Sequence, residues 1–222
     1  MNNIISYQQL NQHDFDYLRN IIYDEAGIKL SDMKKALVQS RLLRRMREMG
    51  IGSYDEYCNY LRENYDEEIE NLINCITTNK TEFFRESEHF SILQKIVEQE
   101  LSHKNIAVWS AGCSTGEEAY SIAIVLLESK FNKNFKILAT DIDSKVLEIA
   151  RMGVYPIDAV QTIDINMLKK YFLKGKEQYA GYVKVKDFLK KNISFQHLNL
   201  LDDNYRPRGF FDVIFCRNVM IY

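Results

Sequence analysis

The sequence predicts an α/β protein with an all-helical N-terminal part and a second part built on a parallel sheet. Up to about residue 101, the pattern is helical, with polar joints at "GIKLSD", "GIGSY" and "TTNKTE". From Ile106 onward, short apolar runs alternate with amphipathic stretches, as expected of buried parallel strands and the helices between them. A chain of 222 residues that is 46% hydrophobic can form one substantial core, or a large domain with a smaller one attached.

We expect a helical domain over residues 1–86 and a second domain over residues 87–222. The chain has only two prolines and no Gly/Ser-rich linker, so we expect a helix that begins near Ser87 to join the two domains. Apolar residues fall on one side of this helix, as a buried stripe requires. These residues are Phe90, Leu93, Val97 and Leu101. The second domain should contain core strands at "IAVWSA", "FKILAT", "ISFQHL" and "FFDVIFC", with helices from about Gly116 and Asp143. The stretch from about 155 to 191 exceeds a simple crossover, and its "LKKYF" and "QYAGYVKVKDF" predict a helix and a short antiparallel strand or hairpin.

Composition excludes several classes of protein. The net charge of -2 gives no overall attraction to nucleic acid or to an acidic membrane. Four cysteines without C-x-x-C spacing or nearby histidine pairs favour reduced thiols over a metal site or a disulfide framework. No segment approaches the roughly 18 apolar residues that a membrane span needs, and the N-terminus has no signal pattern. We therefore expect a cytoplasmic protein that binds no metal and does not insert into a membrane.

The stretch "WSAGCSTGEEAYSIAI", residues 109–124, predicts a ligand site at the carboxyl end of the first strand. Gly112 and Gly116 allow the backbone to approach a bound molecule, although a lone G-x-x-x-G is more often an ordinary tight turn. Glu117 and Glu118 would repel a phosphate at this helix start. They would instead attract a cation, such as an ammonium or sulfonium group.

The next strand ends in "ATDID", which places Asp141 25 positions after Gly116. An acid at about this position hydrogen-bonds the ribose in many folds of this kind, while helix capping is the alternative role for Asp141. Asp143 is better explained as a helix N-cap. A nucleoside that carries positive charge instead of phosphate is S-adenosylmethionine (SAM), so these residues favour a methyltransferase.

Five segments in order resemble the chemotaxis receptor glutamate methyltransferases, the CheR family: "NKTEFFRE", "VWSAGCSTGEEAYSIAI", "ATDID", "NLL" and "FDVIFCRNVMIY". The resemblance extends along nearly the whole chain. It implies a helical receptor-docking domain, then a Rossmann-like SAM methyltransferase domain with a small inserted β-subdomain over about 155–191. In some members that subdomain binds a receptor's C-terminal peptide, and a purely structural flap is the alternative. The reaction implied is methyl transfer to a glutamate carboxylate, with S-adenosylhomocysteine (SAH) as the product.

The resemblance also implies the site residues. Those expected around the cofactor are Asn79, Thr81, Arg85, Glu118, Asp141, Asn199, Leu200, Arg217 and Asn218. Arg85 and Tyr222 are expected to direct the substrate carboxylate and so to be catalytic. Of the adjacent acids we favour Glu118, because only one of two neighbours on a helix should point inward. Simpler roles compete: turn or cap residues at 79 and 81, a surface ion pair of Arg85 with Glu82 or Glu88, a local turn at Asn199, and a frayed terminus at Tyr222.

The segment from Lys34 to Arg47 has six basic residues and no acidic ones. On a helix, an apolar stripe would face the core and three arginines would project from the other side. The stripe is Val38, Leu42, Met46 and Met49, and the arginines are Arg41, Arg44 and Arg47. A solvated basic face and a nucleic-acid helix are the alternatives. The resemblance favours docking to the acidic, methylatable helices of a chemoreceptor, and we expect no nucleic-acid partner.

The core strands expected here are fewer than in the usual sheet of the family, and "FFDVIFC" would form an exposed apolar edge. We therefore expect a truncated chain, or one that a partner or a second copy completes. A noncatalytic receptor-docking or cofactor-sensing module is the alternative function.

Overall fold

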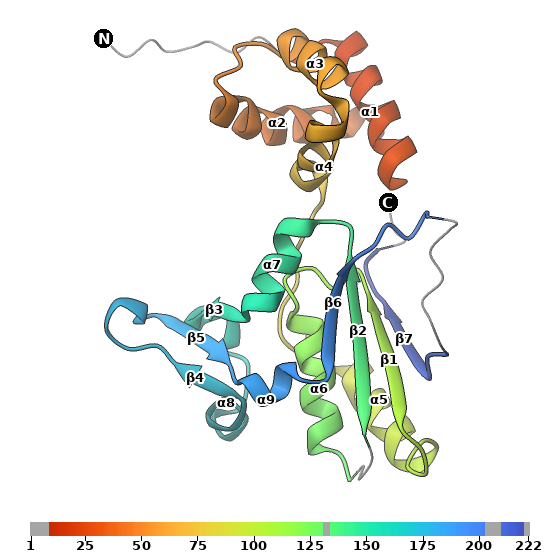
Figure 1. The fold of residues 1–222 in the computed structure, drawn as a ribbon, viewed down its shortest axis with the longest axis vertical. Helices are drawn as coiled ribbons and strands as arrows, with labels where there is room; N and C mark the ends of the chain where they lie inside the picture. Colours follow the sequence, from red (N-terminus) through yellow and green to blue (C-terminus); the bar gives the residue numbers. More distant parts are fainter. Residues whose placement is uncertain (1–8, 131–133, 203–209, 220–222) are drawn as a thin grey trace. The chain divides into compact units, whose positions relative to one another are not determined.

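The computed structural model describes residues 9–130, 134–202 and 210–219, and these form two compact units (Figure 1). The first unit ends at Thr78 and the second begins at Asn79. This division precedes the expected one at 86/87, because residues 79–86 contact the second unit. The side-chain amide of Asn79 donates to Asp143 at 2.7 Å, and the backbone N–H of Phe84 donates to the hydroxyl of Ser121 at 3.0 Å.

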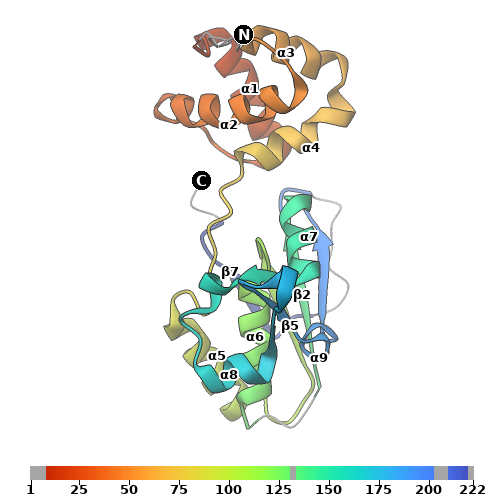
Figure 2. The same ribbon diagram turned by 90° about the vertical axis from the view of Figure 1, so that its left-hand side faces the viewer.

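The first unit is a bundle of helices, as predicted (Figure 2). Its elements are α1 (Gln12–Ala26), η1 (Asp32–Lys34), α2 (Lys35–Met49), α3 (Tyr54–Glu63) and α4 (Tyr65–Ile76). The predicted stripe of α2 is confirmed at Val38, Leu42 and Met46, which are fully buried. Gly50 ends α2 in the left-handed conformation, with φ of 74°, which a glycine adopts without steric cost.

A buried ion pair cross-links the helices of this unit. Glu68 of α4 is only 1% exposed and accepts two hydrogen bonds from Arg45 of α2, at 3.0 and 2.6 Å. The hydroxyl of Tyr57 on α3 donates to the same carboxylate at 3.0 Å. One carboxylate thus joins three helices, and its charge is compensated inside the core.

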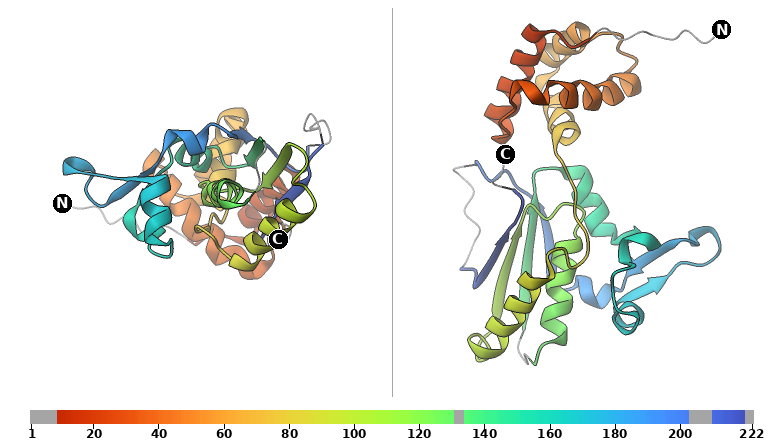
Figure 3. Two further views of the ribbon diagram at one scale, coloured as in Figure 1. Left: turned by 90° about the horizontal axis from the view of Figure 1, so that it is seen from below. Right: turned by 180° about the vertical axis from the view of Figure 1, so that it is seen from behind.

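The second unit contains the predicted parallel sheet. Its strands are β1 (Ile106–Ala111), β2 (Phe135–Asp141), β6 (Ile193–His197) and β7 (Val213–Cys216), and its helices include α5 (Ser87–Gln99), α6 (Glu117–Glu128) and α7 (Ser144–Met152). The strands are all parallel, in the order β6-β2-β1-β7. Helices α5 and α6, yellow and green in Figure 3, lie against one face of this sheet. Phe90, Leu93 and Val97 form the buried stripe of α5, as predicted.

The insertion between β2 and β6 forms a second, antiparallel sheet of three strands in the order β3-β5-β4 (Figure 1). Its elements are β3 (Val154–Pro156), η2 (Ile157–Val160), α8 (Ile165–Tyr171), β4 (Phe172–Lys174), η3 (Glu177–Tyr179), β5 (Tyr182–Val185) and α9 (Asp187–Lys190). The predicted helix and antiparallel pairing are therefore both present. Phe172 and Val183 belong to the same buried cluster as Ile122 of α6. The inserted sheet consequently packs on the main core.

Strand β7 lies at one edge of the parallel sheet in the described ranges and pairs with β1. Ile214 is 55% exposed, and a groove lined by apolar residues of α5 and β7 runs beside it. The expectation of an exposed apolar edge is confirmed for this part of the chain. Across the described residues, no helix combines the length and the apolar character needed to cross a membrane.

Candidate cofactor and active site

The loop between β1 and α6 has an unusual backbone that neighbouring groups hold in place. Gly112, Ser114 and Gly116 have φ of 77°, 50° and 95°, all in the left-handed region. The N–H groups of Gly112 and Cys113 both donate to the carbonyl of Thr140 at 2.8 Å. The loop is therefore tied to the end of β2, at the sheet edge where ligands bind in α/β folds.

Asp141 ends β2 and bonds to this loop. One carboxylate oxygen accepts from the backbone N–H of Ser114 at 2.7 Å, and the other accepts from the N–H of Asp143 at 3.0 Å. Helix α7 is capped by Asp143, whose side chain accepts from the N–H groups of Lys145 and Val146. The capping role predicted for Asp143 is thus confirmed. Asp141 is instead a buried carboxylate beside the glycine loop.

Strained backbone conformations concentrate around the site. Positive φ occurs at five non-glycine residues of the described ranges, and four of them lie here: Phe84, Glu86, Ser114 and Asn218. Each such residue costs on the order of 1–3 kcal/mol, and strain of this kind persists where surrounding contacts determine the conformation. For Phe84 and Glu86 these contacts include the hydrogen bond from the N–H of Phe84 to Ser121 and the ion pair of Glu86 with Arg217.

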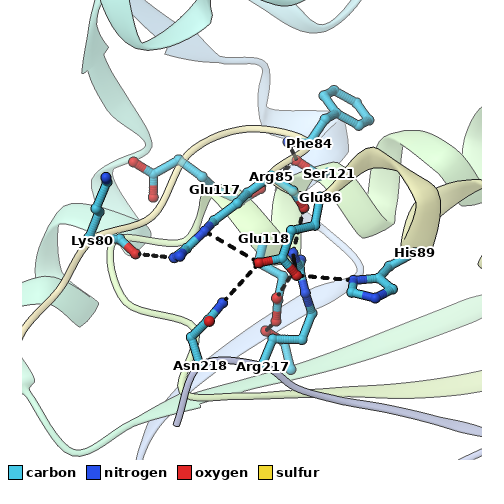
Figure 4. Close-up of polar contacts among 11 residues, drawn as sticks. Lys80, Phe84, Arg85, Glu86, His89, Glu117, Glu118, Ser121, Arg217 and Asn218 are labelled. Carbon is cyan, nitrogen blue, oxygen red and sulfur yellow. Dashed lines mark hydrogen bonds and ion pairs between the residues drawn. The ribbon is translucent and has the colours of Figure 1, made fainter. Parts of the chain in front are cut away.

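Arg217, directly after β7, forms the centre of an ion-pair cluster that Figure 4 shows. Its guanidinium lies 2.9 Å from the carboxylate of Glu86 and 3.2 Å from that of Glu118. It also donates to the backbone carbonyl of Arg85 at 2.6 Å. Asn218 donates to Glu86 at 3.4 Å. Arg217 therefore joins segment 79–86 to the start of α6.

Arg85 is held through both its backbone and its side chain, and the side chain is 29% exposed. The guanidinium donates to the carbonyl of Lys80 at 2.8 Å and lies 3.8 Å from the carboxylate of Glu86 (Figure 4). Within the described ranges its guanidinium forms no ion pair with Glu82 or Glu88, the two partners considered from sequence. A guanidinium with this much exposure keeps donors available for a substrate carboxylate.

Glu117 and Glu118 are both buried, which corrects the expectation that only one of them would point inward. They are 6% and 9% exposed, and this burial raises the pKa of both carboxyl groups. Their partners differ: Glu117 accepts from the hydroxyl of Thr115 at 2.6 Å, while Glu118 accepts from Ser110 at 2.6 Å and pairs with Arg217. Both fit in the first turn of α6 because each finds its own hydroxyl partner.

The remaining predicted residues lie in three places. Asn79 and the half-buried Thr81 belong to the irregular segment before α5, and the backbone carbonyl of Asn79 accepts from the hydroxyl of Ser114 at 3.3 Å. Asn199 and Leu200 follow β6; the side chain of Asn199 accepts from the N–H of Leu201, which is the local turn considered from sequence. Tyr222 lies outside the described residues.

Sequence reasoning missed Glu86 and Ser110, although both contact predicted residues. Glu86 is the last letter of "NKTEFFRE", so the motif itself contained the signal. Nothing in the spacing of Ser110 indicated that its hydroxyl would meet Glu118.

In the first unit, the three arginines predicted to project from α2 do not behave alike. Arg41 is half-buried and donates to the carbonyls of Ile76 and Thr77, the latter at 2.8 Å. It therefore bonds to carbonyls at the end of α4, which corrects the expectation of a projecting side chain. Arg44 is 87% exposed and pairs with Glu48, and Arg47 is exposed.

The site residues fit a cationic nucleoside. Three buried acidic groups, Glu117, Glu118 and Asp141, lie around a loop that contains no lysine, and burial raises the pKa of all three carboxyl groups. Such carboxylates attract ammonium and sulfonium groups and repel phosphate. The buried Nε of Arg217 has no hydrogen-bond partner among the described residues, so one further donor is available to a ligand.

Comparisons with known proteins divide the chain as the structure does. Residues 13–77 match the family described as "CheR methyltransferase, all-alpha domain", and residues 79–222 match "CheR methyltransferase, SAM binding domain". Chemotaxis protein methyltransferase 2 of Pseudomonas aeruginosa is 42% identical over 215 residues, 95% of this chain and 76% of that protein. The Chemotaxis protein methyltransferases of Salmonella typhimurium and Escherichia coli are 41% and 40% identical over 216 residues, 96% of this chain and 74% and 75% of those proteins.

Proposed function

The chain belongs to the CheR methyltransferase family, and we propose that it methylates glutamate side chains of chemoreceptors in the cytoplasm. SAM is the methyl donor. The observation that carries the proposal is the cluster in which Arg217 joins Arg85 to Glu118, beside the acidic glycine loop. It combines a site for a cationic nucleoside with a cation for a substrate carboxylate.

The acidic loop accounts for the cofactor. Bound there, SAM supplies an electrophilic methyl group, whose bond to sulfur breaks as the bond to a carboxylate oxygen forms. We assign Asp141 to the ribose hydroxyls, and Glu118 with the backbone of the glycine loop to the charged amino-acid part. Asn79, Thr81, Asn199, Leu200, Arg217 and Asn218 complete the proposed set.

The substrate carboxylate needs orientation more than activation. A glutamate with a pKa of about 4.3 is ionised at neutral pH, so no general base is required to create the nucleophile. Alignment of the carboxylate oxygen with the methyl carbon then supplies much of the rate. We assign this alignment to the partly exposed guanidinium of Arg85 and, by the family resemblance, to the phenol of Tyr222.

The position of Arg85 depends on its neighbours. Phe84 and Glu86 on either side of it have φ of 56° and 55°, a strained arrangement that would relax without external contacts. Arg217 holds the carbonyl of Arg85 and the carboxylate of Glu86 at the same time. We therefore propose that Arg217 acts on the reaction by positioning Arg85, in addition to any contact with the cofactor.

Receptor docking is assigned to the exposed basic side of α2. Arg44 and Arg47 remain candidates for contact with acidic receptor helices, whereas Arg41 has a structural role at the end of α4. The double variant Arg44→Gln with Arg47→Gln should weaken receptor binding without changing SAH affinity. Lys29→Gln, at an exposed position elsewhere in the same unit, is the control for a lost surface cation.

The experiment that tests the function is methyl transfer from labelled SAM to the cytoplasmic fragment of a chemoreceptor. The proposal predicts label on glutamate residues that base treatment releases as methanol, as expected of a methyl ester. A chain that binds SAH and the receptor fragment but transfers no label would favour the noncatalytic module. Label that resists base would contradict the carboxylate as acceptor.

A further inference from the structure

We propose that Tyr155, in the first strand of the inserted sheet, is a positioning residue for the cofactor loop and couples cofactor binding to the order of that sheet. The inference rests on the proposed cofactor site, and it assigns to the inserted sheet a role in that site. The observation that supports it is the hydrogen bond from the Tyr155 hydroxyl to the loop between β1 and α6.

Tyr155 lies in β3 and is 2% exposed. Its hydroxyl donates to the backbone carbonyl of Thr115 at 2.6 Å, within the loop between β1 and α6. The hydroxyl of Thr115 donates in turn to the carboxylate of Glu117 at 2.6 Å. A residue of the inserted sheet thus contacts the loop directly, 40 positions away along the chain.

Aromatic packing fixes the Tyr155 ring. It meets Phe83 edge-on at 5.1 Å between centroids, and Phe83 meets Phe172 of β4 edge-on at 5.4 Å. The backbone of Tyr155 is paired with Val183 of β5. The ring therefore cannot turn away from the loop without disturbing the pairing and packing of the inserted sheet.

The loop needs external support because of its backbone. Gly112 and Gly116 adopt positive φ without steric cost, but Ser114, with φ of 50°, does so at a cost on the order of 1–3 kcal/mol, so a relaxed loop conformation competes with this one. A Cβ added to Gly116 would lie 3.3 Å from the Tyr155 hydroxyl and 2.8 Å from the Cβ of Ala150, so the loop is closely surrounded. Other supports come from β2, through Thr140 and Asp141. Tyr155 supplies support from the inserted sheet.

A thermodynamic consequence follows from this contact. If the inserted sheet stabilises the loop conformation that binds the cofactor, the bound cofactor must stabilise the inserted sheet by the same factor. Loosening of the sheet should then weaken cofactor affinity, and the cofactor should slow local opening of β3 and β5.

The test compares Tyr155→Phe with the wild-type chain by calorimetric titration with SAH. The variant keeps the ring and loses only the hydroxyl, so the SAH dissociation constant should rise by about three- to tenfold. The Michaelis constant for SAM should rise similarly, with the turnover number nearly unchanged. Tyr171→Phe is the matched control, because the Tyr171 hydroxyl is also buried at the inserted sheet but donates to Glu128, at 2.5 Å.

A second measurement follows hydrogen exchange in wild type and in the variant. In wild-type chain, saturating SAH should slow hydrogen exchange of the peptides that carry β3 and β5 by a similar factor, and this protection should be smaller in Tyr155→Phe. Equal SAH affinity of Tyr155→Phe and wild type, or unchanged exchange in β3, would overturn the coupling while leaving the cofactor site intact. An equal loss in Tyr171→Phe would overturn the positioning role of Tyr155, because the loss would then not depend on the hydrogen bond between Tyr155 and Thr115. A wild-type chain that does not bind SAH would overturn the cofactor site, and the coupling with it.

Discussion

Replacement of Arg217 by methionine should destabilise the second unit through the carboxylate that it leaves behind. Arg217 is 12% exposed, and the side chain of its partner Glu118 is 11% exposed. Without the guanidinium, Glu118 keeps the hydroxyl of Ser110 as a hydrogen-bond partner but has no counter-charge among its contacts in the described residues. Breaking a buried ion pair by removing one partner costs about 3–5 kcal/mol, and partial exposure favours the lower value, about 3 kcal/mol.

The assay is a double-mutant cycle by urea unfolding of the full chain. In the Glu118→Gln background position 118 carries no charge that the substitution could leave unpaired, so Arg217→Met should cost markedly less than in wild type, with a coupling energy of at least about 1 kcal/mol. The same loss in both backgrounds would refute the reasoning, because the cost would then come from lost packing. Lys95→Met, an exposed cation on α5, is the control for a surface substitution.

The pH dependence of this variant has a definite sign. Burial already raises the pKa of Glu118 above its unfolded value, and loss of Arg217 should raise it further. A carboxyl with a raised folded-state pKa binds its proton more tightly in the native state. The destabilisation should therefore be fully present at pH values above that folded pKa and shrink as the pH falls through it. A loss of stability that grew on acidification would contradict this account.

Three further predictions concern other parts of the chain. Because burial raises the pKa of Glu118 and Asp141, acidification should begin to weaken SAM binding at a pH above the ordinary carboxyl pKa. The affinity for SAM should fall more than that for SAH, which lacks the sulfonium charge, and equal pH profiles of the two ligands in calorimetry would contradict this. Gly116→Ala should greatly reduce SAH affinity, because its Cβ would lie 2.8 Å from that of Ala150, whereas Gly50→Ala, with nothing within 4 Å, should leave affinity unchanged. Glu68→Gln should destabilise the helical unit by about 3 kcal/mol in urea unfolding, and the exposed Glu67→Gln should change it little.

Much of the fold could be predicted because it depends on local patterns. Apolar runs in "IAVWSA" and "FKILAT" indicate buried strands, and the acid at Asp143 indicates the start of α7, as the structure confirms. The buried stripe of α2 follows from helical periodicity alone. Each of these features depends on residues close together in the sequence.

The parts that could not be predicted depend on contacts between distant residues. Glu86 and Asn218 are 132 positions apart, and although their motifs were both expected around the cofactor, neither motif indicates the hydrogen bond between these two side chains. The prediction that Arg41 projects from α2 was wrong for a similar reason. Helical periodicity shows on which face of α2 Arg41 lies, but not that carbonyls at the end of α4 lie within reach of its guanidinium. The burial of both Glu117 and Glu118 depended on hydroxyl partners at Thr115 and Ser110.

The most direct test of the proposed reaction measures turnover and SAH affinity together for Arg85→Ala. We predict that methyl transfer to the receptor fragment falls by at least about tenfold, while the SAH dissociation constant changes much less, because the guanidinium acts on the substrate carboxylate. Lys80→Ala, in the same segment, is the control: Lys80 contacts Arg85 through its backbone carbonyl, which the substitution retains. Loss of SAH binding in Arg85→Ala with no separate effect on turnover would contradict the assignment of Arg85 to the substrate.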